Sequence, residues 1–292
     1  MNGTSFQSDI RYWLRQGNTV NYLLFWNIVI FLGLNILRLI AFLTKQPTPF
    51  EWTYQQLAMN VPLGAFILKP WGLITYMFTH VEIFHALFNM INLYWFGNLF
   101  RDFLGNKRVL PLYLLGGMAG GLLYLLSASL FPGYVGTTMV GASAAIMCIL
   151  VAAATLMPNF EIGLMFLGSV KLKWLAMALV VLGLISIPNG NIGGLISHMG
   201  GSLLGFLYIR ALQAGTDLCQ PLIWLFDFKN RRQQQAVTRK FKPKKSPLKV
   251  VKKAEDRDPS RLDQLLDKIN EKGYNSLSAE EKAWLDKVSK EN

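Results

Sequence analysis

The chain has 292 residues, of which 52% are hydrophobic and 16% are charged, and its mean hydropathy is +0.31. This composition excludes an ordinary soluble enzyme and is typical of a polytopic membrane protein. The formal net charge of +12 is unevenly placed, because 18 of the 29 Lys and Arg residues and 10 of the 17 Asp and Glu residues follow residue 228. The sequence therefore predicts a membrane-embedded body followed by a soluble tail.

Six apolar stretches are long enough, or nearly so, to cross about 30 Å of hydrocarbon at roughly 1.5 Å per residue. The expected spans are 20–43, 81–100, 109–130, 141–157, 171–187 and 192–213. The fourth and fifth are short, which helix tilt or a locally thin bilayer can accommodate. The expected fold class is an all-α polytopic membrane protein, a bundle of six transmembrane helices in a domain at 1–214.

Basic residues lie in alternate connections between these spans. The connections 131–140 and 188–191 contain no charged residue, whereas the others, apart from the first, are basic. The basic residues that lead up to the sixth span are Arg11, Arg15, Arg101, Lys107, Arg108, Lys171 and Lys173. The positive-inside rule therefore predicts that both termini are cytoplasmic. Since no organelle-targeting presequence is evident, the default location is a bacterial inner membrane.

The first connection, from Thr44 to His80, is unusually long for an outside loop. Its aromatic residues are Phe50, Trp52, Tyr54, Phe66, Trp71 and Tyr76. Aromatic side chains gather at the boundary between hydrocarbon and water, so we expect this loop to lie in the membrane interface.

Four polar residues lie in the second, fourth and sixth spans, which all run from outside to inside. They are His85 and Asn89, Ser143, and His198. His85, Ser143 and His198 are each about 3–9 Å inside the outer end of a span, and Asn89 is one helical turn deeper than His85. Polar side chains in lipid are costly and usually functional, so we expect the four to converge on one layer.

This set of residues has a chemical meaning. A serine hydroxyl becomes a useful nucleophile when a neighbouring base takes its proton, and neutral histidine is the usual base at pH 7. Ser143 and His198 supply that pair, while the backbone N–H of Ser143 and the side chains of His85 and Asn89 are candidates for stabilising an oxyanion. No Asp or Glu falls at this depth in a span, so the prediction is a Ser-His dyad.

Each residue also has a purely structural interpretation. A serine near a helix end in lipid usually bonds to its own helix or to a neighbouring one, although an intramembrane histidine is rarer. We interpret His80 as a structural hydrogen-bonding residue at the interface. The serines interpreted as packing residues are Ser127, Ser129, Ser197 and Ser202. The convergence of several polar residues, rather than any single one, favours catalysis.

At these residues the chain resembles the rhomboid intramembrane serine proteases. The matching motifs are HxxxxHxxxN at His80, His85 and Asn89, GxSx at Gly141 to Ala144, and His198 within a glycine-rich span. The resemblance implies a six-span bacterial-type enzyme that cleaves transmembrane segments of other membrane proteins near the outer face. Ser143 would be the nucleophile, His198 the base, and His85 and Asn89 part of the oxyanion hole. Neither a cofactor nor a metal is implied.

Two positions depart from the family's pattern, Gly72 after Trp71, where the family often has arginine, and Ala144, which keeps an alternative open. Ala144 stands where the family's motif usually ends in glycine, and its methyl group would either crowd the substrate or be absorbed by the packing. A rhomboid-like protein that grips transmembrane segments without cutting them is one alternative, although such proteins normally lack the Ser or the His. A transporter is the other, but midplane charges and an internal repeat are not found.

The tail divides into a basic linker at 215–254 and a cytosolic helical hairpin at 255–292. Between Phe228 and Ala254 the linker has 11 Lys and Arg residues and no acid, so we expect it to adhere to anionic headgroups at about 1 kcal/mol per basic residue. Nucleic acid is not an expected partner, since the run lies beside the last span. In the hairpin, Pro259 begins one helix, Gly273 ends it, and a capping box from Ser278 to Glu281 begins another, whose partner is unknown.

Overall fold

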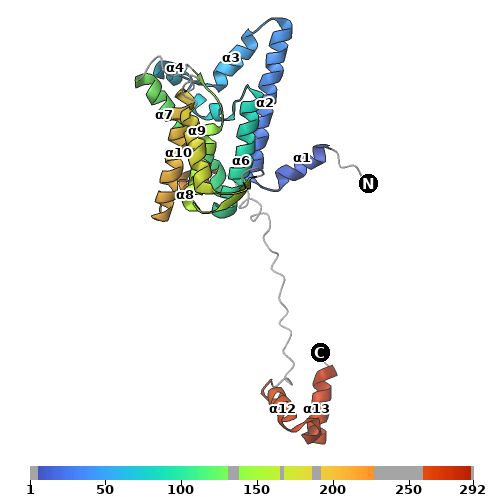
Figure 1. Cartoon of the computed structure of the whole chain (residues 1–292). Helices are drawn as coiled ribbons and strands as arrows, with labels where there is room; N and C mark the ends of the chain where they lie inside the picture. Colours follow the sequence, from blue (N-terminus) through green and yellow to red (C-terminus); the bar gives the residue numbers. More distant parts are fainter. Residues whose placement is uncertain (1–5, 131–137, 165–167, 186–191, 227–258, 291–292) are drawn as a thin grey trace. The chain divides into compact units, whose positions relative to one another are not determined.

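The computed structural model describes residues 6–130, 138–164, 168–185, 192–226 and 259–290 (Figure 1). The chain separates into two compact units, Met1–Gln234 and Gln235–Asn292. The basic run of the expected linker lies outside the described residues.

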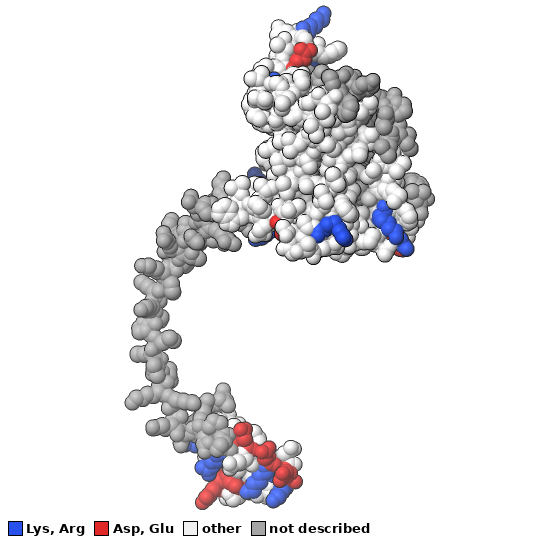
Figure 2. Space-filling model, turned by 90° about the vertical axis from the view of Figure 1, so that its left-hand side faces the viewer, with Lys and Arg blue, Asp and Glu red and all other residues white. Residues whose placement is uncertain are grey.

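The first unit is the expected bundle of apolar helices. They are α2 (Thr19–Thr44), α6 (Ile83–Leu104), α7 (Val109–Leu130), α8 (Ser143–Leu156), α9 (Leu172–Ile185) and α10 (Ile192–Gln213). Within the described residues, the segments with the length and hydropathy of a membrane-crossing helix are Thr19–Thr44, Asn106–Leu130 and Ile192–Gln213. On the face drawn in Figure 2, charged side chains lie at the two ends of this unit and leave an uncharged band between them. An all-α polytopic membrane bundle is therefore confirmed.

Helix α8 lies at the centre of the bundle, where it packs against α6, α7 and α10. Ten of its 14 residues are buried. Glycines of the neighbouring helices allow this close approach, because a Cβ atom on Gly201 would collide with the carbonyl oxygen of Ala144, and one on Gly205 with that of Cys148. Small residues at helix interfaces are how membrane helices gain dispersion contact in lipid. The short α8 thus holds Ser143 inside protein rather than against lipid.

The long first connection folds into short elements over the end of the bundle that carries Ser143. These elements are α3 (Thr48–Leu57), β1 (Met59–Asn60), α4 (Leu63–Leu68), α5 (Gly72–Thr75) and the 3₁₀ turn η1 (Tyr76–Phe78). Strand β1 pairs antiparallel with β2 (Thr138–Met139), just before α8, with Met59 opposite Met139. The sequence analysis missed this pairing. It ties the first connection to the segment that leads into Ser143.

The other end of the first unit carries α1 (Phe6–Arg15), the 3₁₀ turn η2 (Asn106–Arg108) and a two-stranded antiparallel sheet of β3 (Glu161–Leu164) and β4 (Gly168–Lys171). The sequence analysis expected only a connection where this sheet lies. An ion pair between Arg108 Nε and Asp217 Oδ2, 2.8 Å apart, joins the start of α7 to the segment after α10.

The second unit contains α12 (Pro259–Lys272), the 3₁₀ turn η4 (Tyr274–Ser276) and α13 (Ala279–Lys290). The expected capping box is present: the backbone N–H of Ser278 donates to Glu281 Oε2 at 2.7 Å, and the backbone N–H of Glu281 donates to Ser278 Oγ at 3.2 Å. Lys268 Nζ also donates to Glu281 Oε1 at 2.8 Å, which links the two helices. The hairpin surface carries charges of both signs (Figure 2).

Candidate active site

Ser143 and His198 meet at the end of the bundle that β1, β2 and the first connection cover. Ser143 is the first residue of α8, and His198 lies in the second turn of α10. Nε2 of His198 is 2.6 Å from Oγ of Ser143, within hydrogen-bonding distance. The sequence placed both residues at one depth, and the structure brings their reactive atoms into contact.

A turn immediately before α8 fixes the position of Ser143. Gly141 has a φ of +119°, which favours glycine, and a Cβ atom there would lie 2.7 Å from Cε1 of His85. The backbone N–H of Gly141 donates to the carbonyl oxygen of Tyr76 at 2.9 Å. The next N–H, of Ala142, donates to Nε2 of the fully buried His80 at 3.2 Å. Since Nε2 accepts here, His80 has the structural role that the sequence analysis gave it.

His85 and Asn89 lie one turn apart near the start of α6. The ring of His85 contacts that of His80 edge to face, with centroids 5.2 Å apart. Asn89 is buried, and its Nδ2 donates to the carbonyl oxygen of His85 at 2.9 Å. A side-chain amide has two N–H groups, so this bond uses only one of them. The second N–H is available to a group in the adjoining cavity.

All four predicted residues line one cavity of about 480 Å³, here called the Ser143 cavity. Its other lining residues include Tyr76, Asn92, Tyr124, Thr138 and Ser197. The sequence analysis treated Ser197 as a packing residue only and missed Tyr124, although a tyrosine within an apolar span was a usable signal. The lining residues include no Asp, Glu, Lys or Arg. Ser143 and His198 therefore lie in a cavity whose lining offers no charged side chain to assist them.

Ala144 does not narrow this cavity. Its side chain is 1% exposed and is not among the lining residues. The methyl group instead faces α7, because a Cβ atom on Gly120 would lie only 2.6 Å from Cβ of Ala144. Gly120 leaves the space that the extra methyl group occupies, so of the two expected outcomes for this departure the structure favours absorption by the packing.

Comparison with known proteins identifies two segments of the chain. A model described as Rhomboid domain matches residues 68–214, and a second, described as Family of unknown function (DUF6576), matches residues 251–291. The first match covers α6 to α10 and all four candidate residues.

Two curated relatives agree with the first match. The "RHOMBOID-like protein 12, mitochondrial" of Arabidopsis thaliana is 31% identical over 157 residues, which are 49% of this chain and 46% of that protein. The "Presenilin-associated rhomboid-like protein A, mitochondrial" of Danio rerio is 30% identical over 136 residues, which are 45% of this chain and 35% of that protein. The match thus spans less than half the length of each relative. With the Rhomboid domain match over half of its residues, the chain belongs to the rhomboid family.

Proposed function

We propose that this protein is a serine endopeptidase that cleaves transmembrane segments of membrane proteins near the outer membrane face. The observation that carries the proposal is the 2.6 Å contact between His198 Nε2 and Ser143 Oγ in a cavity inside the helix bundle. A serine next to an imidazole acceptor is the arrangement that nucleophilic catalysis requires. Family membership supports the same reaction class.

In the proposed first step, His198 Nε2 accepts the hydroxyl proton of Ser143 while Oγ forms a bond to the carbonyl carbon of the substrate. Negative charge then develops on the carbonyl oxygen. The backbone N–H of Ser143 is suited to donate a hydrogen bond to this oxygen, because the first N–H groups of a helix have no acceptor within that helix. His85 and the second N–H of Asn89 are the proposed side-chain donors.

The tetrahedral intermediate collapses when the C–N bond breaks and His198 gives its proton to the leaving amine. Water then attacks the acyl carbon while His198 takes one of its protons. The bond between this carbon and Ser143 Oγ breaks, His198 gives the proton to Oγ, and the product acid leaves. Of the residues that line the cavity, none is an acid that would orient His198. Close packing of α10 against α7 fixes the backbone that carries His198, since a Cβ atom on Gly200 would lie 2.8 Å from the carbonyl oxygen of Ala119.

We further propose a multi-pass topology of six spans with both termini on the cytoplasmic side, based on the distribution of Lys and Arg. The two relatives are named as mitochondrial proteins and give no support to the bacterial inner membrane expected from the sequence.

We also propose the division into a membrane domain at 1–214, a linker at 215–254 that adheres to anionic headgroups, and a hairpin at 255–292 that docks an unidentified partner. The separate match at residues 251–291 supports the last boundary.

Labelling with a fluorophosphonate probe tests the proposal, because such probes react with activated serines. The purified full chain in detergent is compared with Ser143→Ala and with Ser129→Ala, whose hydroxyl donates to its own helix at Leu125 O. We expect labelling of the natural chain and of Ser129→Ala, and none of Ser143→Ala. If the natural chain is folded by circular dichroism and stays unlabelled, the non-cutting binder replaces the protease.

A further inference from the structure

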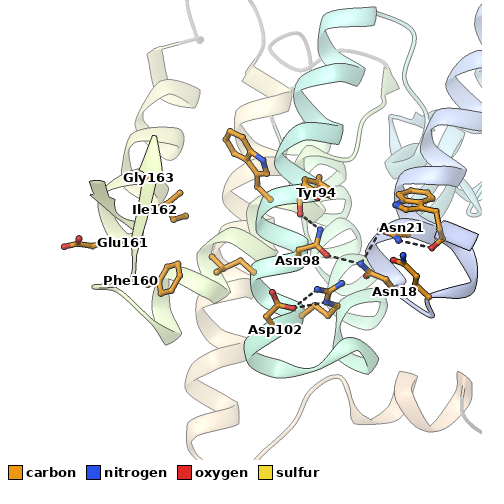
Figure 3. A pocket seen from close by; sticks show the side chains of 14 residues that line it. Asn18, Asn21, Tyr94, Asn98, Asp102, Phe160, Glu161, Ile162 and Gly163 are labelled. Carbon is orange, nitrogen blue, oxygen red and sulfur yellow. Dashed lines mark hydrogen bonds and ion pairs between the residues drawn. The ribbon is translucent and has the colours of Figure 1, made fainter. Parts of the chain in front are cut away.

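A second hollow lies at the opposite end of α6 from the Ser143 cavity. It has a volume of about 780 Å³ and is here called the Arg101 hollow. Helix α6 forms its floor, β3 lies on one side, and α1 with the start of α2 lies on the other (Figure 3). A space of this size is typical of small-molecule sites, yet the proposed proteolysis does not use it.

The polar and aromatic groups of the Arg101 hollow lie at different depths along α6. Arg101 and Asp102 are in the last turn of this helix, which ends at Leu104. Trp95 precedes Leu104 by nine residues, roughly 14 Å along the axis. Tyr94 and Trp95 are 51% and 53% exposed, so they face away from the bundle. The charged side chains at the helix end would therefore lie at the depth of lipid headgroups, and the aromatic side chains at the depth of the glycerol region below them.

An ion pair of neighbouring residues supplies the charges. Nε and Nη2 of Arg101 lie 3.0 and 2.7 Å from Oδ1 of Asp102. Among the described residues, Nη1 of Arg101 and Oδ2 of Asp102 have no protein partner. The two side chains are 28% and 59% exposed. Glu161 also lines the hollow, but its side chain points away from α6 (Figure 3) and accepts a hydrogen bond from Ser169 Oγ at 2.7 Å.

A chain of amides holds the walls of the hollow together. Asn18 Nδ2, at the start of α2, donates to Asn98 Oδ1 of α6 at 3.0 Å and to Asn21 Oδ1 at 3.2 Å. Asn98 Nδ2 donates to the carbonyl oxygen of Tyr94 at 2.7 Å, which leaves its second N–H for a ligand (Figure 3). On the other side, Phe160 contacts Phe103 of α6 edge to face, with centroids 5.5 Å apart. Hydrogen bonds and a ring contact therefore hold the elements around the hollow together.

We propose that the Arg101 hollow binds one phospholipid with a phosphoethanolamine headgroup. The phosphate would accept hydrogen bonds from Nη1 of Arg101 and from Asn98, and the ammonium group would donate to Oδ2 of Asp102. The aromatic side chains would contact the glycerol region and the first part of the acyl chains. Arg101 matches the phosphate and Asp102 the ammonium group of a zwitterion, whereas an anionic headgroup would bring a phosphate close to Asp102 without an ammonium group to donate to Oδ2.

Native mass spectrometry of the full chain in detergent tests this proposal. The protein receives equal amounts of phosphatidylethanolamine, phosphatidylcholine and phosphatidylglycerol with identical acyl chains, and the retained lipid is counted. We expect phosphatidylethanolamine to be retained about five- to tenfold over the other two, because its ammonium hydrogens can bond Asp102 whereas choline has none. Asp102→Asn should remove this preference, and Arg101→Gln should lower retention of all three lipids about tenfold.

Two further variants separate binding in the hollow from general adhesion. Gly163→Trp fills the hollow from β3 without changing charge, and the backbone offers open space at this position, so the variant should fold and lose the retained lipid. Arg210→Gln removes an exposed arginine from the last turn of α10, outside the hollow, and should retain lipid as the natural chain does.

Soluble phosphoethanolamine separates a lipid from a free ligand of the same chemistry. If it binds the natural chain but not Arg101→Gln, while intact lipid is not retained, the hollow holds a soluble compound and the lipid assignment is overturned. Equal retention of the three lipids by the natural chain, unchanged in Gly163→Trp, also overturns the proposal. None of the residues changed in these variants lines the Ser143 cavity, so the result does not depend on the proposed proteolysis.

Discussion

Helix α6 contributes to two polar sites that differ in almost every physical property. Near its start, His85 and Asn89 line a cavity without charged residues, beside a dyad between two packed helices. Near its end, Arg101 and Asp102 form an exposed ion pair in an open hollow. A charge inside lipid is costly, whereas the headgroup region accepts it. The comparison shows that groups proposed for covalent chemistry inside the membrane are neutral and held by close packing, while ionic groups lie where water can reach them.

The largest expected effect comes from removing either residue of the dyad in the Ser143 cavity. Ser143→Ala removes the nucleophile and His198→Ala the base, and each should lower the cleavage of a reporter transmembrane segment by about 10⁶-fold. Cleavage in detergent micelles measures this, with Ser129→Ala as the matched control. Full activity in either variant, shown to be folded, would end the dyad mechanism.

Asn89→Ala sharpens the comparison by removing a neutral donor from the same helix that carries the ion pair. The rate should fall roughly ten- to a thousandfold if the second N–H of Asn89 stabilises the oxyanion. Asn92→Ala, a change of the same kind in the same cavity lining, is the control. Turnover numbers of the two variants on one reporter decide the matter, and an unchanged rate in Asn89→Ala would exclude it from the oxyanion hole.

Gly141→Ala tests how far the neutral site depends on packing. The new methyl group meets the ring of His85 at a backbone φ of +119°, so the turn before Ser143 must shift. A displacement of about 1 Å at reacting groups can cost about a hundredfold in rate. Gly163→Ala, where the added atom meets open space, should cleave the reporter normally. Normal activity in Gly141→Ala would show that the turn tolerates movement.

An exposed ionic contact in the C-terminal unit predicts a modest dependence on pH. Hydrogen bonds from Lys268 and from the backbone N–H of Ser278 lower the pKa of Glu281. Because the folded pKa is lowered, the resulting stability is present above the unfolded pKa of about 4.3 and is lost as pH falls through the folded value. Amide exchange of residues 259–290 in the full chain should therefore accelerate in acid. Glu281→Gln should flatten this dependence, and Glu280→Gln should leave it unchanged.

The smallest expected effect is that of the C-terminal hairpin on the rate of reporter cleavage. Deletion of 255–292 should leave reporter cleavage in detergent intact, because every residue of the Ser143 cavity lies in the first unit. Comparing kcat and KM of the full and shortened chains tests this. A loss of kcat in the shortened chain would assign the hairpin a role in the catalytic cycle.

The sequence by itself determined the bundle and the convergence of the polar residues. Apolar runs of fixed length predict the helices, and helical rise places His85, Ser143 and His198 at one depth. The local signals at Pro259, Gly273 and Ser278 predicted the C-terminal helices, because caps and breakers act through neighbouring residues. All of these depend on short-range geometry.

Only the tertiary structure decided how these pieces meet. The pairing of β1 with β2 joins residues about eighty positions apart, and no local pattern marks it. The direction of the Ala144 methyl group depends on Gly120 of another helix. The Arg101 hollow requires α1, α2, α6 and β3 together. Contacts between distant segments depend on which surfaces pack together, and that is a property of the whole fold.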